Sequence, residues 1–295
     1  MERDFLKELF LDKVITLCIH CGSEHIVHNG KFRGRQRFKC KVCKRTFNTL
    51  SDTPLARTRH LDKWLDFANC LENGLSLRKS AKIVNVSYVS LFYWRHKLLT
   101  GLNNIPISSF TDKVEMQDMY LLISQKGGKK ILNPRRRGYS VYSRKIFKDK
   151  KICVLIAKDV KSNIFSRITN YGLLDLHILE NFLNNYISAD NTICSKMPRI
   201  FKQLAIVNKA KYFEFPNLFQ RQNYIPDILT YEKKFKLWIQ KFKGVSTKYL
   251  DNYLALFKFL YSNNKHDNLA MLIVSSSFNE IQTFNSIRKA TVKYF

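Results

Sequence analysis

The chain has 295 residues, which is enough for two or three domains and at least one sizeable core. It carries 51 Lys and Arg against 23 Asp and Glu, and this formal net charge of +28 predicts a polyanionic partner such as nucleic acid. No apolar run reaches the ~18 residues of a membrane span, and residues 1–5 lack the layout of a signal peptide. We therefore expect a cytoplasmic protein without a membrane partner.

Four of the seven cysteines form two close pairs, Cys18-Ile-His-Cys21 and Cys40-Lys-Val-Cys43. This paired spacing is typical of a zinc ribbon, in which four thiolates complete a tetrahedral shell with no open position. The sequence therefore predicts a structural Zn²⁺ with Cys18, Cys21, Cys40 and Cys43 as its ligands. The other three cysteines are expected to be reduced core thiols, since disulfides are rare in cytosolic proteins.

The ribbon is expected over residues 14–48, after a short helix over residues 1–13. Asn29-Gly30 predicts a hairpin turn, followed by a strand over Lys31–Lys39. In this strand Phe32 and Phe38 are expected on the core face. Alternation then predicts a basic face that contacts DNA phosphates, formed by Arg33, Arg35 and Arg37.

The segment after the ribbon predicts a helix-turn-helix. An amphipathic helix over Leu61–Asn73 is followed by a helix that Ser76 caps, a turn at Asn85-Val86 and a third helix that Ser87 caps and that runs to Leu99. The third helix is expected to enter the major groove of DNA. The candidate DNA contacts of the two helices are Arg78, Lys79, Tyr88, Ser90, Tyr93, Arg95, His96 and Lys97. A bundle that only links two domains is the alternative.

Strand and helix patterns alternate after a linker at residues 101–112, which predicts a mixed sheet flanked by helices. The expected strands are Val114–Ser124, Lys151–Ala157, Ile164–Thr169, Asn191–Ser195 and Lys211–Phe215. The expected helices are Leu174–Tyr186, Met197–Ala205, Ile228–Lys243 and Thr247–Ser262, and a last apolar run is Leu269–Val274. The second strand is continuously apolar, so we expect it to be buried on both faces.

Several short motifs follow one another in a characteristic order. They are Thr53-Pro-Leu-Ala-Arg57, Gly74-Leu-Ser-Leu-Arg-Lys-Ser-Ala81, Phe92-Tyr-Trp-Arg-His96, Val114-Glu-Met-Gln-Asp-Met-Tyr120, Lys126-Gly127 and Gly244-Val-Ser-Thr-Lys-Tyr-Leu-Asp-Asn-Tyr-Leu254. In these motifs the chain, up to about Asn263, resembles an insertion-sequence transposase with a zinc ribbon, a helix-turn-helix and an ISXO-two-like DDE domain. The resemblance implies an RNase H-like sheet that cuts and joins DNA strands with two divalent ions.

The positions that match the family's metal ligands carry Gln117, Lys196 and Leu229 in this chain. A lysine ammonium repels Mg²⁺, leucine offers no lone pair, and glutamine contributes one uncharged oxygen. The resemblance therefore predicts a transposase-family DNA-binding protein whose strand-transfer activity is lost or impaired. Whether the chain is an enzyme stays open at this point.

An active transposase with a displaced site is one alternative. Glu232 lies three residues after Leu229 on the same helix face and is the best stand-in. Asp118 alternates to the opposite strand face from residue 117, and Asp190 precedes Lys196 by six residues, so each requires a backbone adjustment. Asp159, at the end of the buried strand, is a further candidate. Mg²⁺ is expected only if such a site is functional.

A DNA-binding regulator derived from a transposase is the other alternative. The expected fold is a multidomain α+β chain, with its domains at 1–50 (zinc ribbon with a leading helix), 51–102 (helix-turn-helix), 113–262 (RNase H-like mixed α/β domain) and 263–295 (C-terminal tail). The expected partner is double-stranded DNA at the ends of a mobile element. A homo-oligomer on that DNA and a nucleoid-associated location of the bacterial type are also expected.

Overall fold

The computed structural model describes residues 14–32, 34–51, 55–56, 59–103, 106–126, 151–196, 198–215, 226–242 and 244–262, together with Ile287. The boundary between two compact units lies between Ile105 and Pro106. The expected helix over residues 1–13 and the expected apolar run Leu269–Val274 lie outside the described residues. Among the described helices, none combines the length and the apolar character needed to cross a bilayer.

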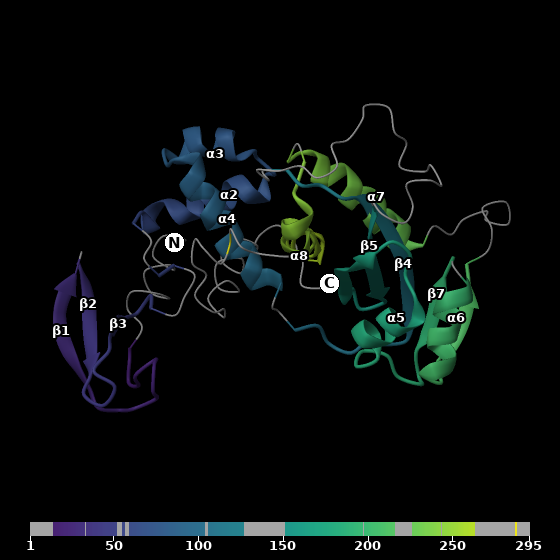
Figure 1. Cartoon of the computed structure of the whole chain (residues 1–295), viewed down its shortest axis with the longest axis horizontal. Coiled ribbons are helices and arrows are strands. Elements are labelled where there is room, and N and C mark those ends of the chain that lie inside the picture. Colours follow the sequence, from purple (N-terminus) through teal and green to yellow (C-terminus); the bar gives the residue numbers. More distant parts are fainter. Residues whose placement is uncertain are drawn as a thin grey trace. The chain divides into compact units, whose positions relative to one another are not determined.

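The ribbon is a small antiparallel sheet of three strands in the order β1-β2-β3 (Figure 1). Its strands are β1 (Ile26–Phe32), β2 (Arg35–Cys40) and β3 (Thr46–Asn48). Phe38 and Phe47 pair across β2 and β3, and their rings stack with centroids 5.8 Å apart. These two rings pack with Cys18 and Cys40, so the small core of the ribbon lies directly beside its sulfur cluster.

The expected hairpin turn at Asn29-Gly30 is wrong. β1 continues through both residues, and the register between β1 and β2 shifts between His28 and Lys31, which marks a bulge. The chain reverses between Phe32 and Arg35, which pair with each other, and Gly34 there has φ 75°. Gly30 also has a positive φ, 66°, and a bulge uses this conformation as readily as a tight turn does. Phe32, expected on the core face, is 56% exposed.

Three helices follow the ribbon, after a 3-10 turn at Leu61–Lys63. They are α2 (Trp64–Glu72), α3 (Leu77–Val84) and α4 (Tyr88–Asn103). The Ser76 hydroxyl accepts a hydrogen bond from the Lys79 N–H, and the Ser87 hydroxyl accepts one from the Ser90 N–H, so each serine caps the helix that follows it. Between α3 and α4, Asn85 adopts the left-handed conformation with φ 52°, which permits the abrupt change of direction.

Two tryptophans pack α2 against α4. Trp64 of α2 is fully buried and stacks on Trp94 of α4, with ring centroids 4.9 Å apart. Phe67 meets the same Trp94 ring edge-on. α4 continues past Leu99, where its end was expected, because Leu102 is buried and extends the apolar face by one more turn.

The second unit is a mixed sheet with the strand order β6-β5-β4-β7-β8. Its strands are β4 (Lys113–Leu122), β5 (Lys151–Asp159), β6 (Ile164–Tyr171), β7 (Thr192–Ser195) and β8 (Lys211–Glu214). β4, β5 and β6 pair antiparallel, whereas β7 pairs parallel with β4, and β8 parallel with β7. Every residue of β5 is buried, as its continuous apolar sequence predicts.

Helices cover both faces of this sheet (Figure 1). They are α5 (Leu176–Leu183), α6 (Pro198–Val207), α7 (Asp227–Gln240) and α8 (Leu250–Ser262). Strand alternation divides β4 between them: Val114 and Met116 pack in one core with residues of α5 and α6, and Met119 packs in the other with residues of α7 and α8. The predicted mixed α/β class is therefore confirmed for this unit.

Candidate functional site

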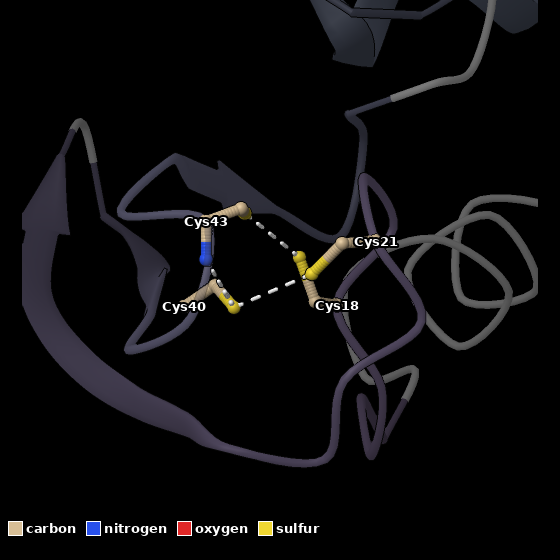
Figure 2. A group of neighbouring side chains, drawn as sticks. All are labelled: Cys18, Cys21, Cys40 and Cys43. Atoms are coloured by element: carbon tan, nitrogen blue, oxygen red, sulfur yellow. Dashed lines mark hydrogen bonds between the residues drawn. The ribbon is translucent and has the colours of Figure 1, made fainter.

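The four ribbon cysteines form one cluster (Figure 2). Their sulfurs all lie within 4.8 Å of one another, with Cys18 Sγ 3.7 Å from Cys43 Sγ and Cys21 Sγ 3.6 Å from Cys40 Sγ. A tetrahedron with Zn–S bonds of about 2.3 Å has S···S edges of about 3.8 Å. All four are free thiols, and these separations are far from the ~2.05 Å of a disulfide. The donor set therefore fits a structural Zn²⁺, as the sequence predicts.

Backbone N–H groups of the two knuckles point at the sulfurs. The His20 N–H donates to Cys18 Sγ and the Cys43 N–H donates to Cys40 Sγ, each at 3.4 Å. The hydrogen bond from the Cys43 N–H is the largest of several contacts that together lower the pKa of the Cys40 thiol to about 6. Zinc binds thiolates rather than thiols, so this arrangement favours the form of Cys40 that can hold the metal.

A second group of polar side chains, the β4–α7 cluster, lies where β4 meets α7. The side-chain amide of Gln117 donates to Glu232 Oε2, and the Lys236 ammonium forms an ion pair with Glu232 Oε1. Only 14% of the Glu232 side chain is exposed, so this carboxylate is occupied on both oxygens in a largely buried place. Of the acidic residues expected to substitute for the family's ligands, Glu232 is the one that the structure places beside Gln117.

Lys196 follows β7 directly and is level with Gln117. β4 and β7 are parallel, with Lys113 opposite Thr192 and Glu115 opposite Cys194. Two residues further on, this register places Lys196 opposite Gln117, and alternation directs both side chains to the same face. Lys196 is exposed. Leu229, at the third position, packs against the apolar core between the sheet and the two last helices.

The other three stand-ins lie away from Gln117. Asp118 accepts a hydrogen bond from Tyr120 Oη at 2.7 Å, on the opposite face of β4. Asp159 accepts hydrogen bonds from Thr111 and Asn163 and stabilises the turn between β5 and β6. Asp190 precedes Thr192, which pairs with Lys113, so it lies at least about 13 Å along the strand from residue 117.

A buried glutamate that was not among the predicted site residues lies close to Gln117 on the same strand. Glu115 precedes Gln117 by two residues and is 6% exposed. Its Oε2 accepts a hydrogen bond from the Ile228 N–H in the first turn of α7 at 3.0 Å, and its Oε1 accepts one from Lys113 Nζ at 3.1 Å. Strand alternation predicts that Glu115 lies on the same face as Gln117. Its hydrogen bond with α7 joins residues far apart in the sequence, so that contact could not be predicted from a local pattern.

These positions do not fit a divalent metal centre of the two-ion type. Such a centre needs several oxygen ligands around the same point, preferably carboxylates. Within the described parts of the chain, the four cysteines are the only group of three or more His, Cys, Asp or Glu side chains that could hold a metal. The β4–α7 cluster instead combines Gln117 and the ion-paired Glu232 with the cation of Lys196.

The expected DNA contacts of the helices divide into exposed and buried side chains. Arg78 and Lys79 are exposed on α3, Tyr88 is 56% exposed at the start of α4, and Ser90 and Tyr93 are half-buried. Arg95 and His96 are 4% and 1% exposed, so they belong to the helical core and the prediction that they contact DNA is corrected. They were mispredicted because α4 has apolar contacts on more than one face.

Arg95, His96 and Lys97 each contact another part of the protein. Arg95 Nη2 donates to the Leu75 carbonyl at 3.5 Å, and the His96 ring meets Phe92 edge-on. Lys97, half-buried, donates through Nζ to the Ala56 carbonyl at 3.2 Å. In the ribbon, Arg35 and Arg37 are half-buried on β2, and Arg33 lies outside the described residues.

Comparison with known proteins links the chain to mobile DNA. The chain is 28% identical over 144 residues to an uncharacterized protein in transposable element ISH50 of Halobacterium salinarum. The match covers 48% of this chain and 49% of that protein, so the chain matches about half the length of this relative. A search against models of protein families finds no match.

One solved structure related to mobile DNA is also similar over much of the chain. It is the crystal structure of a pre-cleavage Mos1 transpososome, with a TM-score of 0.21 and 11% identity over 72% of this chain and 78% of that chain. A TM-score of this size carries no argument about the fold.

Proposed function

We propose that this chain is a transposase-type protein that binds double-stranded DNA but does not use divalent ions to cut and join it. The similarity to a protein of transposable element ISH50 and the motifs shared with insertion-sequence transposases support the first half. The mixed sheet, in which three antiparallel strands are followed by two parallel ones, is compatible with the RNase H-like domain implied by that resemblance.

The observation that carries the second half is the side-chain set at the β4–α7 cluster. Gln117 and Lys196 lie opposite each other at positions that the resemblance to insertion-sequence transposases matches to carboxylates, and Leu229 packs into the core. Glu232 is next to Gln117, but it is the partner of the Lys236 ammonium. Asp118, Asp159 and Asp190 lie elsewhere, so the arrangement gives no support to a displaced metal site. The same observation favours the second candidate function, a DNA-binding regulator derived from a transposase.

Charge and exposure support the binding of duplex DNA by the first unit. The whole chain has a formal net charge of +28, and Arg78 and Lys79 are exposed on the helix that precedes α4. The start of α4 presents Tyr88 and Ser90, which are side chains able to contact base edges. We assign the ribbon to phosphate contacts, through Arg35 and Arg37.

The test uses the zinc-loaded full-length chain and a duplex that carries the ends of its element. Affinity is expected to fall steeply with salt, with a log–log slope of about −0.9 for each phosphate contacted. Lys79→Gln is expected to reduce that slope by about one contact, whereas Lys202→Gln, which removes an exposed lysine from α6, leaves it unchanged. A flat response to salt would contradict DNA binding.

Strand transfer is measured on the same duplex with Mg²⁺ or Mn²⁺. We expect no cleaved or joined product from the natural chain, and no change on Glu232→Gln. Cleavage that requires the metal and disappears in the Glu232→Gln variant would overturn the second half of the proposal and support an active transposase with a displaced site.

A further inference from the structure

The sheet of the second unit has a polar region on the face that α7 and α8 cover elsewhere. Parallel pairing aligns Lys113 with Thr192 and Lys211, and it aligns Cys194 with Phe213. Side chains of directly paired residues lie on the same face, and every second residue along a strand returns to it. We call this region the β4–β7–β8 face and define it by Lys113, Lys196, Lys211 and Phe213.

Alternation along β8 agrees with this assignment. Tyr212 packs in the core beneath α5 and α6, and Phe215 packs in the opposite core with Cys194. Phe213 therefore lies on the same side as Phe215, away from α5 and α6. It is 53% exposed, and Lys196 and Lys211 are exposed too. The exposed ring of Phe213 thus has one cation on its own strand, Lys211, two residues before it. The second cation, Lys196, directly follows β7, the neighbouring strand about 5 Å away.

Within the described part of the chain, the acidic groups next to this face already have partners. Glu115 accepts hydrogen bonds from Lys113 and from the Ile228 N–H, and Glu232 is paired with Lys236. Glu214 alternates with Phe213 and so belongs to the other face of β8. Lys196 and Lys211 therefore leave the face with an excess of positive charge.

Cations beside an exposed aromatic ring are the chemistry that binds a single nucleic-acid strand. Lysines contact the phosphates, and the ring stacks on a base, which is accessible only when that base is unpaired. We propose that the β4–β7–β8 face binds single-stranded DNA without a divalent ion, with Lys196 and Lys211 on phosphates and Phe213 stacked on a base. Lys196 thus brings to the DNA phosphates the positive charge that a metal ion would otherwise supply.

This inference rests on the proposed function because it takes DNA as the partner, but it concerns residues outside the duplex-binding unit. The two are therefore tested on separate ligands with the same protein. The ligands are a fluorescent oligothymidine and a blunt duplex of equal length. The zinc-loaded full-length chain is kept in buffer without Mg²⁺ and without a chelator, since a chelator would remove the ribbon's zinc.

We expect Phe213→Ser to weaken oligothymidine binding by about 5- to 150-fold, the range for loss of one base–aromatic stack. Lys196→Gln and Lys211→Gln are each expected to reduce the salt slope by about 0.7, the value per phosphate for single strands. Phe213→Tyr keeps a stacking ring, and it is expected to keep the affinity. All four variants should bind the blunt duplex as the natural chain does.

Two variants of α6, which covers the opposite face, serve as matched controls. Lys202→Gln removes one exposed lysine and Val207→Ser removes one exposed apolar side chain, and neither should change oligothymidine binding. The inference is overturned if Phe213→Ser and Lys196→Gln bind oligothymidine like these controls, or if the natural chain binds it only with Mg²⁺. If the natural chain binds oligothymidine but does not bind the blunt duplex, the proposed function is contradicted instead.

Discussion

The ribbon and the sheet of the second unit differ in what organises them. In the ribbon, four cysteine sulfurs lie within 4.8 Å of one another, and the accompanying core contains little more than Phe38 and Phe47. The sheet has extensive apolar cores on both of its faces. A small module requires a metal to fold, whereas a packed sheet can lose its metal ligands and keep its fold. Under the proposed function, this difference accounts for a ribbon that depends on its metal ligands and a sheet that keeps its fold without them.

The largest expected effect is the loss of the ribbon fold in Cys40→Ser. Three thiolates cannot close the zinc shell, and residues 14–48 have too small a core to fold without it. We expect the variant to contain no zinc by elemental analysis, while the second unit keeps its cooperative melting. Cys153→Ala, which changes a buried cysteine of β5, is the control and should retain one zinc per chain. Full zinc content in Cys40→Ser would refute the assignment.

Adding carboxylates to the sheet tests whether its fold can hold a divalent ion. The double variant Gln117→Asp, Lys196→Asp places two carboxylates beside Glu232, on the same face. We expect saturating Mg²⁺ to stabilise it by about 1–3 kcal/mol, seen as a higher melting temperature, and to leave the natural chain unchanged.

Adding Glu232→Gln to the double variant should remove that stabilisation, since it removes the third carboxylate. An equal Mg²⁺ effect on the natural chain would show that it has a metal site in this unit already. No Mg²⁺ effect on the double variant would show that these residues do not converge on one ion.

A smaller effect is expected from Glu115→Ala. This carboxylate satisfies the Ile228 N–H at the start of α7, and truncation leaves that buried donor without its partner. We expect the free energy of unfolding of the second unit to fall by about 1–3 kcal/mol in urea denaturation. Glu214→Ala removes an exposed glutamate of β8 and should change it by less than about 0.5 kcal/mol. If the two variants are equally stable, Glu115 does not stabilise α7.

The smallest expected effect is a gain of stability that depends on pH. Burial raises the pKa of Asp251, at the start of α8, to about 6. The folded state therefore binds a proton that the unfolded state has already released between about pH 4 and 6, so stability falls as the pH rises through that window. Asp251→Asn keeps an acceptor for the Ile168 N–H and avoids the buried charge.

We expect the Asp251→Asn variant to be more stable than the natural chain by about 1–2 kcal/mol at pH 7.5 and no more stable at pH 4. Urea denaturation at the two pH values measures this difference. A gain of the same size at both pH values would show that the carboxylate charge is not its cause. Zinc content should be the same in both proteins, because Asp251 does not belong to the cysteine cluster.

Local sequence patterns predicted the features that depend on local chemistry. The cysteine spacing predicted the sulfur cluster, the serine positions predicted the caps of α3 and α4, and the apolar run over residues 151–157 predicted the buried strand β5. The β4–α7 cluster was predicted only through Glu232, because helix periodicity places it on the same face as Leu229.

Features that depend on pairing over long distances could not be predicted in this way. The partner of Glu115 lies more than a hundred residues away, and the register of β4 with β7 decides that Lys196 lies opposite Gln117. Arg95 and His96 were placed on a DNA-binding face because polar residues on a helix are usually exposed, but here the packing of α4 buries them. The Asn-Gly pair of β1 favours a positive φ but does not choose between a turn and a bulge.

The measurement that tests the central claim most directly is the number of metal ions held by the natural chain. Native mass spectrometry of the full-length protein is recorded after equilibration with Zn²⁺ and an excess of Mn²⁺. The account predicts one zinc per chain, bound by the four cysteines, and no second ion. A further ion in each chain that disappears in the Glu232→Gln variant would contradict it.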